Sequence, residues 1–180
     1  MPDHPLVPAA PLVRLAEREL HWCLRCNRAG RRLRLERPFA VISRLGDGVF
    51  WYVLMLALLA LDGWAALPAV LRMLAAGGIC LLLYTWLKGK TTRPRPCARS
   101  PVIRARVAPL DEYSFPSGHT LHAVSFTVVA LTHYPALAWL LLPFTALVAL
   151  SRLVLGLHYP SDVLAGALLG GGLAALVLQL

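Results

Sequence analysis

The sequence predicts an all-α polytopic membrane protein, a bundle of about five transmembrane helices preceded by an N-terminal amphipathic interfacial helix. Composition is the first reason, because 58% of the 180 residues are apolar and 15% are charged, against about 45–50% and about 25% in soluble domains. The second reason is that the apolar residues gather in runs of about 20, the length that crosses a bilayer. The apolar content excludes a disordered chain, and four cysteines are too few for a disulfide-stapled secreted domain.

The N-terminal segment is too charged to cross a membrane. Residues 1–11 are rich in proline, and we expect a loose tail there. Between residues 12 and 35, leucine and alanine recur at helical spacing against a series of arginines, which is typical of an amphipathic helix in the interface. We therefore predict two parts, with residues 1–35 as tail and amphipathic helix and residues 36–180 as a membrane-embedded core.

The core contains five apolar runs long enough to span a bilayer. They cover residues 46–65, 66–87, 119–135, 136–157 and 160–180. Three consecutive glycines at 170–172 predict close packing of the last helix against a neighbour. Five spans would place the long polar segment 88–118 on the same face as the N-terminal segment and the turn at 152–162. The polar groups that can do chemistry would then gather on one membrane face.

The formal net charge of +9 has two interpretations in a membrane protein: basic loops against anionic headgroups, or a site for an anionic ligand. By the span count, all of the 18 Lys and Arg residues except Arg72 fall on the polar face. We expect Lys90, Arg93 and Arg99 to be headgroup contacts or solvated charges. Nucleic-acid binding is not expected, because so many basic residues adjoin apolar spans.

Three polar clusters lie at span ends on this face, at residues 88–96, 114–119 and 151–162. Lys88, Arg95 and Arg152 supply fixed cations, and the guanidinium group offers a fork of donors that matches phosphate oxygens. Ser117 and Gly118 precede a predicted helix, where free backbone N–H groups and the helix dipole favour an anion. The clusters together predict a pocket for a phosphoryl group.

Two histidines and an aspartate complete the predicted site. His119 and His158 come from different helices, so they can act as proton donor and nucleophile on opposite sides of one phosphorus atom. Asp162 lies four residues after His158 and can accept its ring N–H, which fixes the tautomer and raises the nucleophilicity. The polar segments offer no metal-ligand set, so we expect neither metal nor cofactor. Catalysis would rest on positioning and charge stabilisation.

These clusters resemble the three signatures of the type 2 phosphatidic acid phosphatase superfamily. The chain reads Lys-x6-Arg-Pro from Lys88, Pro-Ser-Gly-His from Pro116 and Ser-Arg-x5-His-x3-Asp from Ser151, in that order. A combination of three such motifs is far more specific than one short motif. The resemblance covers about residues 42–180.

The resemblance implies a role for each of these positions. His158 would attack phosphorus and become a phosphohistidine, Asp162 would orient it, and His119 would protonate the leaving oxygen. Five residues would hold the phosphoryl oxygens: Lys88, Arg95, Ser117, Gly118 and Arg152. Water would then release phosphate.

The function expected from the resemblance is that of an integral membrane phosphatase, metal-independent, acting on a lipid phosphomonoester or diphosphate whose tail stays in the bilayer. Undecaprenyl diphosphate is the first expectation, and phosphatidylglycerophosphate or phosphatidic acid is the close alternative. The same residues would serve a lipid phosphotransferase, and a non-catalytic lipid-binding protein is a third hypothesis. The sequence leaves the oligomeric state open.

The membrane face of the site is predicted differently by two arguments. The resemblance implies a bacterial cytoplasmic membrane protein with its site on the periplasmic face. The positive-inside rule would instead place the basic face in the cytoplasm, and nine of its arginines lie between Arg14 and Arg44, away from the predicted pocket. We favour the periplasmic face.

Several other polar residues carry weaker expectations. Cys23 and Cys26 form a CxxC motif without a second ligand pair, which favours two small half-buried helix residues over a metal or redox site. Cys80 is expected in the packing, and Cys97 in the polar segment. His122, one turn after His119, is expected to face inward beside the site.

Overall fold

The computed structural model describes residues 10–109 and 111–180, and within these residues it is helical with no named strand. The long helices are α1 (Ala10–Arg32), α3 (Phe50–Asp62), α4 (Leu67–Thr91), α6 (Gly118–His133), α7 (Ala138–Val154) and α8 (Pro160–Val177). The short ones are α2 (Glu36–Arg44), η1 (Leu45–Val49), η2 (Gly63–Ala66), α5 (Pro96–Arg99) and η3 (Pro135–Leu137). The predicted tail at residues 1–11 lies mostly outside the described residues.

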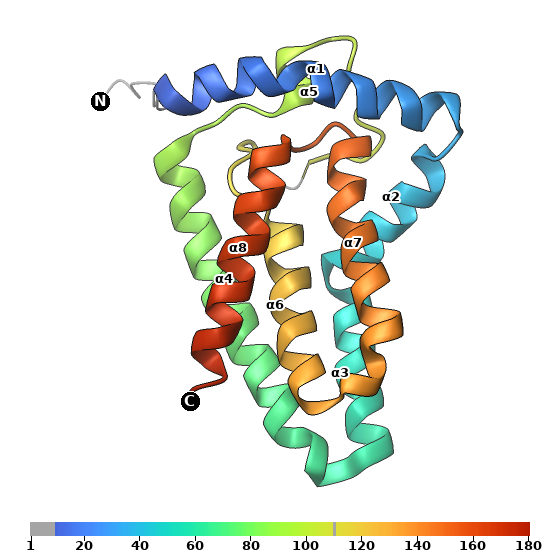
Figure 1. Ribbon diagram of the computed structural model, residues 1–180, viewed down its shortest axis with the longest axis vertical. Helices are drawn as coiled ribbons and strands as arrows, with labels where there is room; N and C mark the ends of the chain where they lie inside the picture. The colour runs from blue at the N-terminus through green and yellow to red at the C-terminus, as the bar shows by residue number, and fades with distance from the viewer. Residues whose placement is uncertain (1–9, 110) are drawn as a thin grey trace.

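Five helices run side by side as a bundle, and α1 lies across one end of it (Figure 1). These five are α3, α4, α6, α7 and α8, and they coincide with the five predicted apolar runs. The prediction of an all-α membrane helix bundle with an N-terminal amphipathic helix is confirmed. The division into residues 1–35 and 36–180 stays a prediction.

Three segments of the described chain are long and apolar enough to cross a membrane: Glu36–Thr91, which contains both α3 and α4, Pro135–Val154 and Pro160–Val177. Helix α6 has 16 residues, which is about 24 Å at about 1.5 Å per residue. It is therefore shorter than the bilayer core of about 30 Å. The count of five spans stays a prediction.

Helix α6 lies in the middle of the bundle and packs against α4, α7 and α8. Its closest approach is to α8, where Gly166 and Gly170 face it. A Cβ on Gly170 would lie 2.3 Å from the Leu121 carbonyl oxygen, and one on Gly166 would lie 2.6 Å from that of Ser117. The close packing expected of the run 170–172 thus involves Gly170 together with Gly166, one turn earlier, since a Cβ on Gly172 would meet open space. Small residues four apart let helix backbones approach in this way.

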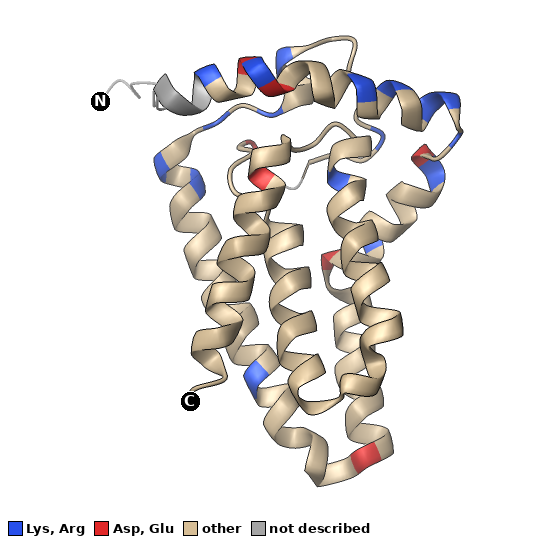
Figure 2. Ribbon diagram, in the orientation of Figure 1, with Lys and Arg blue, Asp and Glu red and all other residues tan. Residues whose placement is uncertain are grey.

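The outer surface of the bundle is apolar, as expected where helices face lipid tails. Leu56, Leu82 and Leu168 are each at least 65% exposed. Basic and acidic residues instead gather around α1 and the loops beneath it (Figure 2). The bundle therefore presents one polar end, where α1 crosses, and long apolar flanks.

Candidate active site

A cavity of about 400 Å³ opens below the polar end of the bundle. Its polar lining includes six of the eight predicted site residues: Lys88, Arg95, Gly118, His119, Arg152 and His158. Two carboxylates, Asp47 and Asp111, also line it. The rest of the lining is largely apolar and comes mainly from α3, α4 and α6. The three sequence signatures, which lie up to 74 positions apart between Lys88 and Asp162, thus meet around one cavity.

Lys88 and Arg95 form a cationic pair bridged by one carboxylate. The Lys88 ammonium pairs with Asp111 Oδ2, and Arg95 Nη2 donates to Asp111 Oδ1 at 2.8 Å. Burial opposes ionisation of Asp111, but the hydrogen bonds and charges of Lys88 and Arg95 outweigh it, so the pKa of this carboxyl lies below its ordinary value. An ionised carboxylate therefore sits where two predicted phosphate ligands converge. Asp111 belongs to none of the three sequence signatures.

Arg152 is a buried cation with unmet hydrogen-bonding capacity. It lies on the last turn of α7, is 3% exposed, and lines the cavity. Its Nη1 donates to the Ser43 hydroxyl, whereas its Nε has no partner among the described residues. A buried guanidinium left with free donors favours an anionic ligand, since burying a charge is costly unless it is paired and hydrogen-bonded.

His158 lies in the connection between α7 and α8 and is 1% exposed. Its Nδ1 is 2.7 Å from the carbonyl oxygen of Ser114. Because a carbonyl only accepts, Nδ1 carries the ring proton and Nε2 keeps its lone pair. Nε2 lies 3.0 Å from Arg95 Nη1. Burial, together with the charges of Arg95, Arg152 and Lys88, holds the pKa of His158 well below its ordinary value. The imidazole is therefore neutral at physiological pH, with its lone pair among the cations of the cavity.

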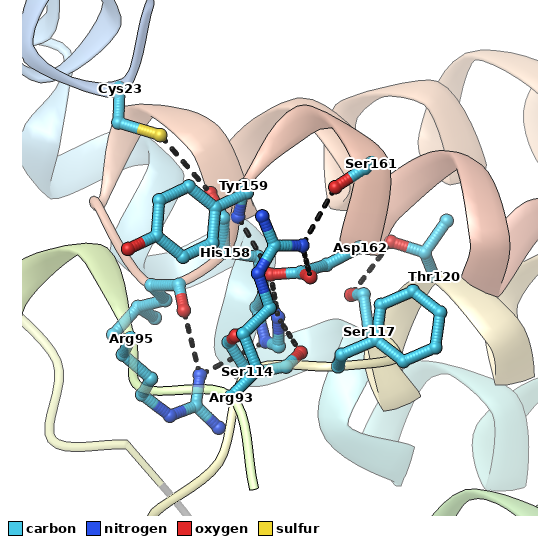
Figure 3. Close-up of polar contacts among 12 residues, drawn as sticks. Cys23, Arg93, Arg95, Ser114, Ser117, Thr120, His158, Tyr159, Ser161 and Asp162 are labelled. Atoms are coloured by element: carbon cyan, nitrogen blue, oxygen red, sulfur yellow. Dashed lines mark hydrogen bonds and ion pairs between the residues drawn. The ribbon is translucent and has the colours of Figure 1, made fainter. Parts of the chain in front are cut away.

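Asp162 lies beside His158 but is not its short hydrogen-bond acceptor. The Oδ2 atom is 3.6 Å from His158 Nδ1, and it accepts the Tyr159 backbone N–H at 2.8 Å as a cap of α8. The Oδ1 atom accepts from Arg93 at 2.6 Å. The ring is thus held by the Ser114 carbonyl, while Asp162 fixes the start of α8 directly behind it (Figure 3).

Arg93 is a central residue of this network, and the expectation that it is a headgroup contact or a solvated charge is wrong. Its side chain is fully buried. Besides Asp162, it donates to Glu19 Oε2 on α1 at 2.8 Å and to the Ser161 hydroxyl at 2.7 Å. The guanidinium stacks over the Tyr159 ring, with its Cζ 4.1 Å from the ring centroid. These partners lie far from Arg93 in the sequence, so no local pattern could reveal them.

Helix α1 contacts the start of α8, the end of α7 and the connection between them, where His158 lies. Glu19 accepts from the Ser161 backbone N–H at 2.7 Å, and Asn27 donates to the Val154 carbonyl at 2.9 Å. The Cys23 thiol lies 3.8 Å from the His158 carbonyl oxygen (Figure 3). Cys23 is buried and Cys26 partly buried, and both are free thiols. Among the described residues, no three His, Cys, Asp or Glu side chains lie close enough together to hold a metal ion.

The remaining predicted residues lie at the start of α6. His119 lines the cavity, and its Nε2 is 3.5 Å from Asp47 Oδ1. Gly118 lines the cavity as well. Ser117 is buried; its hydroxyl lies 3.0 Å from the Thr120 hydroxyl, and its backbone N–H donates to the Asp162 carbonyl. In this arrangement the Ser117 side chain is turned toward α6 instead of the cavity.

The fold and the site define a helical membrane bundle that encloses a cationic, histidine-containing cavity at its polar end. The chain belongs to the PAP2 superfamily, because the model of that family matches residues 65–180. The membership predicted from the three signatures is therefore confirmed.

Curated relatives of the chain include several phosphatases. A decaprenylphosphoryl-5-phosphoribose phosphatase of Mycobacterium tuberculosis is 38% identical over 129 residues, which cover 67% of this chain and 68% of the relative. An undecaprenyl-diphosphatase of Sulfolobus acidocaldarius is 41% identical over 70 residues, 38% of this chain. That alignment spans only 34% of the archaeal protein's length.

Two solved structures share the fold. The PAP2-type phosphatidylglycerolphosphate phosphatase of Bacillus subtilis superimposes with a TM-score of 0.73 and 26% sequence identity, over 92% of this chain and 85% of that one. LpxE of Aquifex aeolicus, at 24% identity, has a TM-score of 0.65 over 90% and 95% of the two chains.

Proposed function

We propose that the chain is a membrane lipid phosphatase that hydrolyses a phosphomonoester or diphosphate through a phosphohistidine at His158. The observation that carries the proposal is the state of this ring. Its Nδ1 proton is held by the Ser114 carbonyl, and its Nε2 lone pair is next to Arg95, in a cavity lined by Lys88 and Arg152 as well. A neutral imidazole with a fixed tautomer is an activated nucleophile, and the cations are placed for a phosphoryl group.

The proposed reaction has two halves. His158 Nε2 attacks phosphorus, the bond to the leaving oxygen breaks, and the electron pair goes to that oxygen with a proton from His119. Water then attacks the phosphohistidine, gives a proton back to His119 and releases phosphate. Lys88, Arg95 and Arg152 balance the charge on the phosphoryl oxygens, which is the main work of catalysis in phosphoryl transfer.

A lipid substrate fits the lining of the cavity. Trp51, Met55, Leu74, Leu81 and Phe126 supply apolar walls from α3, α4 and α6. The polar end would take the phosphate and the walls the first part of a lipid tail. Undecaprenyl diphosphate is our preferred substrate, supported by the polyprenyl substrates named for two relatives. Phosphatidylglycerophosphate or phosphatidic acid is the alternative, supported by the name of the Bacillus neighbour.

A panel of lipid phosphates in detergent or nanodiscs tests the proposal. We expect phosphate release in excess EDTA, because three side chains supply the positive charge, and inhibition by vanadate. His158→Ala should abolish release and the acid-labile, base-stable phosphoenzyme. Full activity of His158→Ala would refute the mechanism. Transfer of phosphate to a lipid or sugar hydroxyl, seen among the products, would identify a phosphotransferase instead.

A further inference from the structure

A break in the helix before α3 places an acidic residue at the cavity. Asp47 and Gly48 in η1 leave the helical backbone conformation, and Gly48 has a φ of 127°, which favours glycine. On the other side, a Cβ on Gly46 would lie 2.8 Å from the Val148 side chain, so a larger residue here would force Val148 or α7 to shift. Short interruptions of this kind in helices are frequent at functional sites. Nothing in the three sequence signatures accounts for this Gly-Asp-Gly sequence.

The carboxylate at this break faces His119. Asp47 Oδ1 is 3.5 Å from His119 Nε2, and both residues line the cavity. The other cavity carboxylate, Asp111, has its two oxygens on Arg95 and Lys88. Asp47 is therefore the carboxylate that is placed to act on the proposed proton donor.

A proton donor in this cavity needs a negative neighbour. The groups that face His119 are Arg152 from α7, Lys88 from α4, His158 from the α7–α8 connection and His122 from its own helix. Burial of the ring and the two fixed cations among these groups favour a neutral imidazole. A neutral imidazole would have to lose a proton to form an anion in order to protonate a leaving oxygen. A carboxylate beside the ring favours the imidazolium, which donates readily.

We propose, on the basis of the proposed function, that Asp47 is a positioning residue for the general acid, holding the His119 ring at Nε2 and stabilising its protonated form. In the first half-reaction a ring proton of the imidazolium passes to the leaving oxygen as the phosphorus–oxygen bond breaks and the His158–phosphorus bond forms. In the second half-reaction His119 regains a proton from the attacking water. Asp47 gains no proton in either half-reaction, so its charge does not change through the cycle.

Leaving-group dependence tests this role, because a structural role would affect all substrates alike. The substrates are a lipid alkyl phosphate, whose alkoxide needs a proton, and p-nitrophenyl phosphate, whose phenolate does not. We expect Asp47→Asn to lower kcat for the alkyl phosphate by about 10–100-fold, and that for p-nitrophenyl phosphate by less than about threefold. Asp47→Glu should restore much of the difference. Glu112→Gln, which removes a negative charge from an exposed position, is the matched control and should change neither rate.

The double variant Asp47→Asn, His119→Ala separates this proposal from the proposed function. If Asp47 acts through His119, the double variant is no slower on the alkyl phosphate than His119→Ala alone. Equal losses on both substrates, or additive losses, would overturn the role of Asp47 while His119→Ala still showed its leaving-group dependence. If His119→Ala itself lacked that dependence, the proposed general acid would be wrong and the role of Asp47 would fall with it. Vanadate protection against thermal unfolding, expected to match wild type in Asp47→Asn, shows that the cavity is folded.

Discussion

His158 combines two features, burial and surroundings of positive charge. Both favour the neutral ring, so the pKa of His158 lies well below its ordinary value of 6.5. A group with a lowered pKa is deprotonated, and here nucleophilic, at every pH above that lowered value. The proposed nucleophile is thus available across the physiological range without a base to remove its proton.

We therefore expect no ascending limb near pH 6.5 in the rate of phosphoenzyme formation. On the acid side, the rate should fall only at a pH well below this value, where His158 gains a proton. Rapid-quench labelling between about pH 4.5 and 8 measures it, with the second ionisation of the substrate phosphate, about pH 6, determined separately by ³¹P NMR. A limb at pH 6.5 that does not follow the substrate's own titration would contradict the assignment of the ring as a buried neutral group.

Asp111 pairs with two of the residues that we propose to hold phosphate oxygens, Lys88 and Arg95. Its carboxylate pairs with both Lys88 and Arg95 and has a lowered pKa, so it is charged at neutral pH and competes with an anionic ligand. We expect Asp111→Asn to tighten vanadate binding by roughly 3–10-fold, since two partly exposed ion pairs of about 0.2–1 kcal/mol each no longer compete. Titration followed by inhibition of phosphate release measures the effect.

The same substitution should lower the melting temperature of the ligand-free protein, because Lys88 and Arg95 then face each other without a counter-charge. Vanadate should restore it. Glu112→Gln on the neighbouring exposed residue controls for the change in net charge. Unchanged or weaker vanadate binding in Asp111→Asn would show that the carboxylate helps to hold the ligand site open instead of competing for it.

The sequence predicted the residues of the site more completely than their connections. Spacing in three motifs identified Lys88, Arg95 and His158, and these side chains line the cavity from positions at or next to helix ends. Arg93 belongs to the same basic run but is separated by 69 residues from Asp162 and 74 from Glu19. Its burial depends on how α1 crosses the bundle, and no local pattern contains that information. Asp47 was not predicted for a similar reason, because its proposed role depends on the position of His119 at the start of α6.

Among the elements, the long apolar helices were predictable and the short polar ones were not. Runs of about 20 apolar residues define α3, α4, α7 and α8 almost by themselves. Helix α2, with nine residues that mix arginines and apolar side chains, has too short a pattern to be told from a loop. The start of α3 was expected at residue 46, whereas the backbone departs from helix at Asp47 and Gly48. Whether a glycine adopts a positive φ depends on tertiary packing, which composition alone does not reveal.

Helix α1 does more than lie against the membrane, because Glu19 links it to the start of α8. Glu19 accepts from Arg93 and from the backbone and hydroxyl of Ser161, and Arg93 in turn holds Asp162. We expect Glu19→Gln to destabilise the protein by about 1–3 kcal/mol, the cost of weakening hydrogen bonds to charged groups, and Glu19→Ala to cost more. Thermal unfolding in detergent measures this.

We also expect Glu19→Gln to lower activity, because it loosens the start of α8, which lies next to His158. It should affect an alkyl phosphate and p-nitrophenyl phosphate equally, unlike the loss in Asp47→Asn. Glu17→Gln is the matched control on the same helix. The Glu17 carboxylate is 62% exposed, and its pair with Arg99 is long, at 3.7 Å. If Glu17→Gln and Glu19→Gln were equally mild, α1 would not support the site through this contact.

At the scale of the whole molecule, the two ends of the bundle differ strongly in charge (Figure 2). The cavity accounts for Lys88, Arg95 and Arg152, and Arg93 is used within the protein. The nine arginines between Arg14 and Arg44 lie on α1, on α2 and in the turn between them, outside the cavity lining. These charges are free to follow the positive-inside rule, but they also suit anionic headgroups on either leaflet. Charge alone therefore does not decide which face carries the site.

Cysteine labelling decides which membrane face carries the site. Cys97 itself is a poor probe, because it is partly buried and burial raises the pKa of its thiol, which lowers the thiolate fraction that reacts. Ala98, next to it at the polar end, and Ala65, in η2 at the opposite end, are both exposed, so Ala98→Cys and Ala65→Cys in a background without other cysteines form a matched pair.

With the site on the outer face, as we propose, a membrane-impermeant maleimide should label Ala98→Cys in intact spheroplasts and Ala65→Cys only after lysis. The reverse pattern would place the site in the cytoplasm and point to a substrate that is made and consumed on the inner leaflet. Labelling of both in intact spheroplasts would mean that the two ends do not lie on opposite sides, and the count of five spans would then be wrong.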